Sequence, residues 1–234
     1  SYFDAILGAI FSGDDSMVSF STAPRYYDYQ AQLQWRPSDR LELRVLLFGS
    51  DDFLSVVAAQ NSDNDGRSTG FELGRTFHQL QSTLRYAISD QLSLYVGLAT
   101  SYQTLDLAPG NIADFQLTFD PVTLRADLDY RGLPGVQLRG GVQGTATRFR
   151  VQARLPPPTK EGQVALPLSA RELVTATEEG VDGLISVWTD ATWQALDTLS
   201  INGGVRLNAW LGRFGAVAAD PRLLIAWDAT DTTR

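Results

Sequence analysis

The sequence contains no cysteine, and this absence excludes disulfide bonds and thiolate metal sites. It contains a single lysine, Lys160, so almost all of its basic residues are arginines. The formal net charge is -8. A chain with this excess of negative charge repels phosphate backbones, so we expect no nucleic-acid partner.

Long hydrophobic runs are also absent. Hydrophobic residues make up 44% of the chain, yet no stretch approaches the ~18 apolar residues that a membrane-spanning helix needs. Ser1 leads directly into the apolar stretch 2–7 without a preceding basic segment, so we expect no signal peptide in this sequence.

A two-residue alternation of apolar and polar side chains is present instead. Leu92, Leu94, Val96 and Leu98 alternate with smaller or more polar residues, and residues 199–208 repeat the pattern. Successive side chains of a strand point to opposite faces, so each such stretch has one apolar and one polar face. Many long strands of this kind are typical of an outer-membrane β-barrel. We therefore predict an all-β fold, an antiparallel transmembrane β-barrel.

Periodicity and turn residues predict about ten strands. They cover residues 2–11, 18–35, 41–50, 69–87, 92–107, 115–130, 136–153, 183–195, 199–211 and 221–229. Pro24 interrupts the second of these, and Pro121 predicts a bulge or register break in the sixth because proline cannot donate a ladder hydrogen bond. Residues 169–172 have capping-box spacing, which is compatible with one short helix before Leu173 and Val174.

The connections between the predicted strands alternate in length. Short turns are expected near Pro37, Asp90, Gly132 and Asp197, and longer loops near Asp14, Asp63, Asn111 and Lys160. The connection around Arg213 is ambiguous, and a register shift at Pro221 would lengthen it. In outer-membrane barrels the short turns face the periplasm and the long loops face outside, which predicts the side of each connection.

The two phases of the alternation predict the faces of the strands. The side chains expected in the lumen are Gln79, Gln81, Thr83, Arg85, Arg125, Asp127, Asp129, Gln137, Arg139 and Gln143. Leu94, Val96, Val205 and Leu207 are expected to contact lipid. Aromatic residues expected to form a girdle at the short-turn ends are Trp35, Tyr86, Tyr130 and Trp193.

Three short stretches have a familiar composition, namely Pro-Arg-Tyr-Tyr-Asp-Tyr-Gln at residues 24–30, Phe-Gly-Ser-Asp-Asp at residues 48–52 and Asp-Pro-Arg-Leu at residues 220–223. The first two resemble early barrel strands of TonB-dependent outer-membrane receptors, and the third resembles the same family. In that family a barrel of about 22 strands encloses a plug domain. The resemblance implies that residues 1–234 are a single β-barrel segment, part of a larger barrel, without a plug domain or TonB box.

The same resemblance implies a location and partners. The location is the bacterial outer membrane, and the function is uptake of a scarce nutrient such as an iron chelate. The partners are membrane lipid, lipopolysaccharide, the remaining strands and plug of the same barrel, and TonB through parts outside this sequence. The small-molecule substrate stays undefined, and no catalytic residue, enzyme activity or resident cofactor is expected.

Two other classes of protein stay open. One is a self-contained barrel of about ten strands acting as a pore, an adhesin or a rim protease. The only histidine, His78, follows a strand that ends near Asp51 and Asp52, an acid–histidine arrangement that a protease needs. The other is a soluble ligand-binding β-protein such as a sandwich, although sandwich strands are shorter, about 5 to 6 residues.

The sharpest local motif is the loop 61–72, which nearly fits a calcium-binding loop. Its ligands would be Asn61, Asp63, Asp65, the Arg67 carbonyl and Glu72, with Gly66 at the turn. Asn replaces the usual first Asp, and the flanking segments are strands. An exposed hairpin loop prefers the same residue types. A calcium-binding loop and an ordinary hairpin loop therefore both stay open as interpretations of this segment.

A run of three arginines forms a second candidate site. Arg148, Arg150 and Arg154 are placed to contact an anionic substrate or lipopolysaccharide. The alternative is that they form a solvated strand end.

Overall fold

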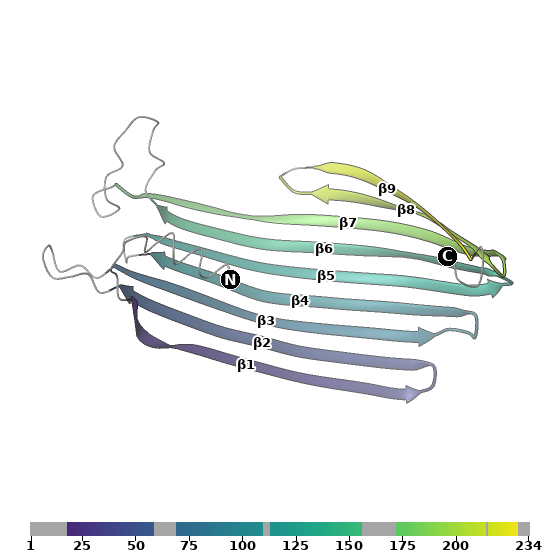
Figure 1. Cartoon of the computed structure of the whole chain (residues 1–234), viewed down its shortest axis with the longest axis horizontal. Coiled ribbons are helices and arrows are strands. Elements are labelled where there is room, and N and C mark those ends of the chain that lie inside the picture. The colour runs from purple at the N-terminus through teal and green to yellow at the C-terminus, as the bar shows by residue number, and fades with distance from the viewer. Residues whose placement is uncertain (1–17, 59–68, 110–112, 156–171, 214, 229–234) are drawn as a thin grey trace, which may run out of the picture.

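The chain forms one antiparallel sheet in which each strand pairs with its neighbours in sequence (Figure 1). The computed structural model describes residues 18–58, 69–109, 113–155, 172–213 and 215–228. The nine strands of the described residues are β1 (Val18–Ser38), β2 (Leu41–Ala58), β3 (Thr69–Ala87), β4 (Leu92–Pro109), β5 (Asp114–Leu133), β6 (Val136–Leu155), β7 (Val174–Leu196), β8 (Leu199–Leu211) and β9 (Ala216–Trp227). β1 and β9 do not pair with each other, so these strands form an open sheet.

The all-β prediction is confirmed, and the strands are long. β1 to β7 have between 18 and 23 residues, whereas β8 and β9 have 13 and 12. At about 3.3 Å per residue an 18-residue strand spans ~60 Å. Within the described residues no helix is long and apolar enough to cross a membrane.

All the predicted short turns lie at one end of the sheet (Figure 1). They connect β1 to β2, β3 to β4, β5 to β6 and β7 to β8. The turn between β5 and β6 contains Gly135 with φ of 68°, a left-handed conformation that favours glycine because it lacks a Cβ atom. At the other end, the described strands are separated by residues 59–68, 110–113 and 156–173. The connection at 212–215 is short. At this end of the sheet β7 extends well beyond β8 and β9.

Several strands extend further than the alternation predicts. β2 continues to Ala58 where residues 41–50 were predicted, and β7 begins at Val174, nine residues before Gly183. These extensions are irregular in polarity, but their backbones pair continuously with β3 and β6. Val174 therefore opens a strand and does not extend a helix. The predicted strand 2–11 and residues 169–171 lie outside the described part of the chain.

The prolines have different effects on the ladders. The interruption expected at Pro24 is only a register shift between Thr22 and Arg25, because β1 continues from Val18 to Ser38. The register break expected at Pro121 is wrong, because Pro121 pairs with Thr147 of β6 and the β4–β5 register is the same on both sides of it. The shift expected at Pro221 is also wrong, since Pro221 pairs in register with Val205. Pro121 and Pro221 each omit one donor without inserting a residue, so the ladder keeps its register there.

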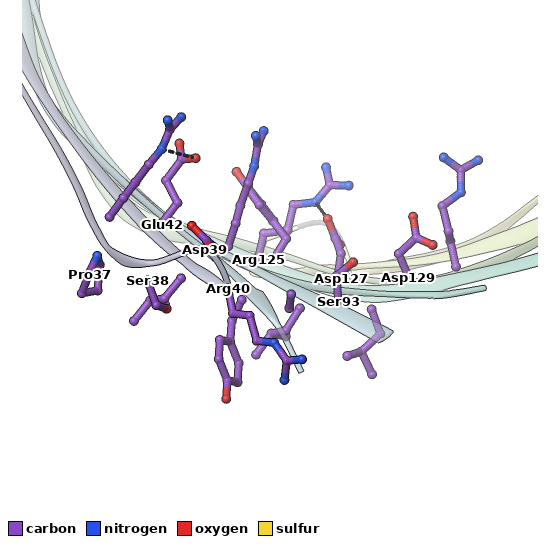
Figure 2. A pocket seen from close by; sticks show the side chains of 18 of the residues that line it. Pro37, Ser38, Asp39, Arg40, Glu42, Ser93, Arg125, Asp127 and Asp129 are labelled. Atoms are coloured by element: carbon purple, nitrogen blue, oxygen red, sulfur yellow. Dashed lines mark hydrogen bonds and ion pairs between the residues drawn. The ribbon is translucent and has the colours of Figure 1, made fainter. Parts of the chain in front are cut away.

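The two faces of the sheet differ as the alternation predicts. Cross-strand partners share a face, so registers align residues of the same kind into rows. One row contains Leu43, Leu84, Val96, Ala126 and Val142, and the adjacent row on the opposite face contains Arg44, Thr83, Gly97, Arg125 and Gln143. Figure 2 shows Glu42, Arg125, Asp127 and Asp129 on the inside of the curved sheet. We call the polar, concave side the inner face and the apolar, convex side the outer face.

The aromatic residues predicted for the short-turn end all lie on the outer face. Trp35, Tyr86, Tyr130 and Trp193 pair with leucine, valine or isoleucine of the outer rows. Trp35 and Trp193 expose 55% and 52% of their surface, so neither is part of a packed core.

A second aromatic row crosses the outer face nearer the long-loop end. The Tyr29 hydroxyl lies 2.7 Å from His78 Nδ1, and the His78 ring stacks on Tyr102 with 6.4 Å between ring centroids. Gly49 of β2 lies between Tyr29 and His78 in the ladder, and its missing side chain lets the two rings meet above it.

This glycine generates a stability prediction. A Cβ atom at Gly49 would lie 2.6 Å from both the Phe77 carbonyl oxygen and the Tyr29 hydroxyl. We expect Gly49→Ala to lower the free energy of unfolding by about 1–3 kcal/mol, the usual cost of overpacking. Gly144→Ala is the control, since no atom lies within 4 Å of its added methyl group. Denaturant titration of the full-length protein in detergent micelles is the measurement, and equal effects of the two substitutions would contradict this packing.

Candidate functional site

The inner face carries an arginine belt near the short-turn end of the sheet. The belt comprises Arg36, Arg44, Arg85, Arg125, Arg131, Arg139, Arg206 and Arg222. Five acidic residues lie among them, namely Glu42, Asp127, Asp129, Asp190 and Asp220. Arginine exceeds acid here, although the whole chain has a net charge of -8. The belt is therefore a local reversal of the charge of the chain.

The strand pairing places arginines and acids next to one another on the inner face. The Arg125 Nε donates to Asp127 Oδ2 at 2.6 Å, two residues along β5 on the same face. The Arg36 Nε donates to Glu42 Oε2 at 3.0 Å across the β1–β2 turn, and Arg44 also contacts Glu42. Cross-strand neighbours on one face lie only about 5 Å apart. Such pairs therefore form once the strands pair in the correct register.

Asp190 of β7 is the most buried charge of the belt. Its side chain is only 1% exposed, and both of its carboxylate oxygens accept a hydrogen bond. Arg139 of β6 donates to one at 3.0 Å, and Arg222 of β9 donates to the other at 2.8 Å. Gly204 of β8, the ladder partner of Asp190, leaves the space through which Arg222 reaches across a strand. Asp190 thus connects three elements of the sheet.

Arg206 of β8 is held by neutral groups. Its guanidinium donates to Asn208 Oδ1 and to Ser186 Oγ, both at 2.9 Å. Ser186 is fully buried, and it donates to Asn208 Oδ1 at 2.7 Å. Asn208 in turn donates to Asp220 Oδ2 at 2.6 Å. Arg206 is therefore oriented, but no carboxylate of the described residues bonds to it directly.

A small hollow of about 250 Å³ lies between these arginines. Its lining consists of Arg125, Arg139, Trp188, Asp190, Arg206 and Arg222. Trp188 forms one wall, with the Arg125 guanidinium 5.7 Å from its ring centroid. A larger hollow of about 850 Å³ shares Arg125, Arg139 and Trp188 and extends to the β1–β2 turn (Figure 2). Guanidinium groups in such a concave site are suited to binding anions.

The predicted calcium ligands fall mostly outside the described residues. Asn61, Asp63, Asp65 and Arg67 lie there, and only Glu72 is described, on β3 in register with Ser55 and Ala108. Among the described residues, no cluster of three His, Asp or Glu side chains is placed to hold a metal ion. The calcium loop stays a prediction.

The acid–histidine pair of a rim protease is not assembled. His78 bonds to Tyr29, whereas Asp51 lies with Arg25 at 3.6 Å and with Thr76. The three arginines near the long loops are each paired with an acid on the outer face. Arg148 contacts Asp120, Arg150 contacts Glu179, and Arg154 contacts Asp114.

Every side chain predicted for the lumen lies on the inner face. The sequence interpretation did not include Trp188, Asp190, Arg206 and Arg222, which complete the small hollow, or Ser186, which orients Arg206. The sequence did contain a signal that three of these residues lie on the inner face, because Ser186, Trp188 and Asp190 occupy the polar phase of the predicted strand 183–195. Their meeting with Arg222 depends on the register of β8 and β9, which alternation does not specify.

The buried carboxylate generates a second stability prediction. We expect Asp190→Asn to lower the free energy of unfolding by about 1–3 kcal/mol, because the amide is uncharged and has only one acceptor oxygen, so one of the two guanidiniums loses its acceptor. The control is Glu179→Gln, whose pair with Arg150 is exposed on both sides and contributes at most ~1 kcal/mol. Denaturant titration of both variants in detergent compares them. An Asp190→Asn effect no larger than that of Glu179→Gln would contradict the role of Asp190.

Comparisons with known proteins concern the fold. No protein-family model matches the chain, and no curated protein sequence matches it. Solved structures do match. The outer membrane transporter YddB from Escherichia coli has a TM-score of 0.61 at 10% identity, over 87% of this chain and 29% of the transporter.

Two further structures agree. The ferric yersiniabactin uptake receptor FyuA from Yersinia pestis has a TM-score of 0.61 at 14% identity, over 90% of this chain and 37% of FyuA. The copper transporter OprC has a TM-score of 0.58 at 14% identity, over 90% of this chain and 36% of OprC. The chain thus spans about a third of the length of these proteins. It has the fold of part of an outer-membrane transporter barrel, which is the fold that the resemblance to TonB-dependent receptors implies.

Proposed function

We propose that this chain is part of the wall of a TonB-dependent-receptor-like barrel in the bacterial outer membrane. The observation that carries the proposal is the outer face, an apolar band bordered by aromatic rows on both sides. Soluble proteins rarely expose large contiguous apolar surfaces. Exposed large side chains on this face include Leu33, Leu98, Leu124, Leu128, Val142, Ile185, Val187 and Leu207.

The height of the apolar band fits a membrane. On β4 the outer face runs from Leu92 through Leu94, Val96 and Leu98 to Tyr102. These ten residue steps correspond to ~33 Å along the strand. At the tilt of about 40° found in such barrels, this is a height of ~25 Å, the usual apolar height of an outer-membrane barrel. Beyond Tyr102 the outer face becomes polar, with Asp106 bonded to Gln116.

The inner face supports a solute path. Its arginines, acids and amides are suited to water and to polar solutes, as in the lumen of known barrels. We propose uptake of a scarce nutrient as the function, with an iron chelate as one candidate, because one matched structure is a ferric yersiniabactin uptake receptor and another a copper transporter. In this proposal the segment supplies wall and lumen lining, and the remaining strands, the plug and the coupling to TonB come from outside the present sequence.

Cysteine labelling tests the orientation of the proposed barrel. The 234 residues contain no cysteine, so a single introduced thiol is distinguishable against the unsubstituted protein. Cysteines at Asp65, Asn111 or Lys160, between strands at the long-loop end, are expected to react with a membrane-impermeant maleimide on intact cells that express the full-length gene.

Cysteines at Asp90 or Asp197, in the short turns, are expected to react only after the outer membrane is permeabilised. Each variant is its own control, because permeabilisation makes both ends accessible. Equal labelling of all five positions on intact cells would refute the proposed orientation.

A further inference from the structure

We infer that the small hollow beside Trp188 is a binding subsite for one oxyanion group, a carboxylate or a phosphate. Nothing in the fold alone requires such a site, since an inner wall of amides and hydroxyls would be equally compatible with water. The inference rests on the proposed function in one respect, namely that the inner face encloses the interior of a closed barrel.

The charge balance of the hollow is the first argument. Four guanidiniums, those of Arg125, Arg139, Arg206 and Arg222, line it. Two carboxylates form ion pairs with them, since Asp127 bonds to Arg125 and Asp190 bonds to both Arg139 and Arg222.

The four guanidiniums exceed these two carboxylates by two charges, and Arg206 is the one of the four that forms no ion pair among the described residues. The nearby Asp220, which accepts a hydrogen bond from Asn208, reduces the excess to one. A concave site with uncompensated positive charge attracts an anion.

The second argument is the orientation of Arg206. A guanidinium has five N–H donors in a fixed plane, and only two hydrogen bonds, to Asn208 and Ser186, are formed by this one. Both acceptors are neutral and buried, so they fix the side chain without neutralising its charge. A planar guanidinium held in this way is prepared for bidentate bonding to a carboxylate or phosphate.

The third argument is size. Glycines replace side chains next to the cluster, because a Cβ atom at Gly141 would contact the Trp188 indole nitrogen and one at Gly204 would contact Asp190. These gaps leave a hollow of about 250 Å³. Sites for whole drug-sized ligands occupy about 300–1,000 Å³. The hollow therefore accommodates one charged group of a larger molecule, with the flat Trp188 ring as its apolar wall.

The anionic group can come from two sources that share this chemistry. One is a solute that passes through the barrel. The other is an acidic side chain from another part of the same protein that lies in the barrel interior. Both would bond to the free donors of Arg206 and Arg125, and an experiment with two arms distinguishes them.

The first arm measures binding of radiolabelled inorganic phosphate. The full-length gene product, purified in detergent, is dialysed to equilibrium against phosphate at low ionic strength. We expect one phosphate bound per protein, about ten-fold weaker binding in Arg206→Gln and in Arg125→Gln, and weakening by added salt. Arg150→Gln is the matched control, because Arg150 lies on the outer face in an exposed pair, and we expect no change there.

The second arm detects an internal carboxylate. Arg206→Lys keeps the positive charge and supplies an amine that a carbodiimide couples directly to a touching carboxylate. Lys160 is the only other lysine of the 234 residues, so the linked peptides are readily assigned by mass spectrometry. A link from position 206 to an acid outside these residues would identify the internal source and support the subsite.

Two results would overturn the subsite. One is phosphate binding that Arg206→Gln and Arg125→Gln leave unchanged. The other is absence of phosphate binding together with links only to Asp127, Asp190 or Asp220. The cysteine-labelling pattern is independent of both arms. If both arms fail while the labelling is as expected, the subsite is refuted and the barrel proposal stands, whereas failed labelling would refute the proposed orientation of the barrel.

Discussion

Backbone hydrogen bonding across neighbouring strands is the interaction on which the rest of this structure depends. Each of β2 to β6 pairs with both sequence neighbours over almost its whole length, and β7 pairs with β8 from Gly183 onwards, so the paired peptide groups satisfy one another. In hydrocarbon an unpaired N–H or C=O costs several kcal/mol, and a paired sheet removes this cost. The same ladder fixes the register, and the register decides which side chains share a face. The apolar outer face and the arginine belt are therefore two consequences of one pairing scheme.

The inner face shows how the pairing scheme generates a charged site from single residues on separate strands. Asp190 on β7 is bonded by Arg139 from β6 and by Arg222 from β9, two strands away, because Gly204 on the intervening β8 carries no side chain. The same absence of side chains leaves the hollow beside Trp188 open. Fixed charges and glycine gaps thus determine the local charge and shape of the inner face, while the hydrogen-bonded backbone keeps the sheet rigid. If the inner face lines the proposed solute path, that path selects by charge as well as by size.

Much of this architecture is predictable from the sequence, because alternation and turn residues are local signals. The faces of residues 79–85, 125–129 and 137–143 and the four short turns follow from them. The extents of β2 and β7 do not, since their long-loop ends lack alternation and are strands only through pairing with β3 and β6. The row of Tyr29, His78 and Tyr102 and the pairing of Asp190 with Arg222 also depend on register between strands. Proline is also a misleading signal for the register between strands, because Pro121 and Pro221 fit the ladder without shifting it.

The central claim is that the two faces of this sheet contact different solvents, lipid outside and water inside. Spin labels placed one at a time along β4 in the full-length protein, reconstituted in lipid bilayers, test it most directly. Collision rates with oxygen, which concentrates in lipid, and with a polar nickel complex, which stays in water, are measured by electron paramagnetic resonance. The account predicts a two-residue alternation, with oxygen contact at Leu94, Val96 and Leu98 and nickel contact at Tyr95, Gly97 and Ala99. Nickel contact at all six positions, or an absence of alternation, would contradict it.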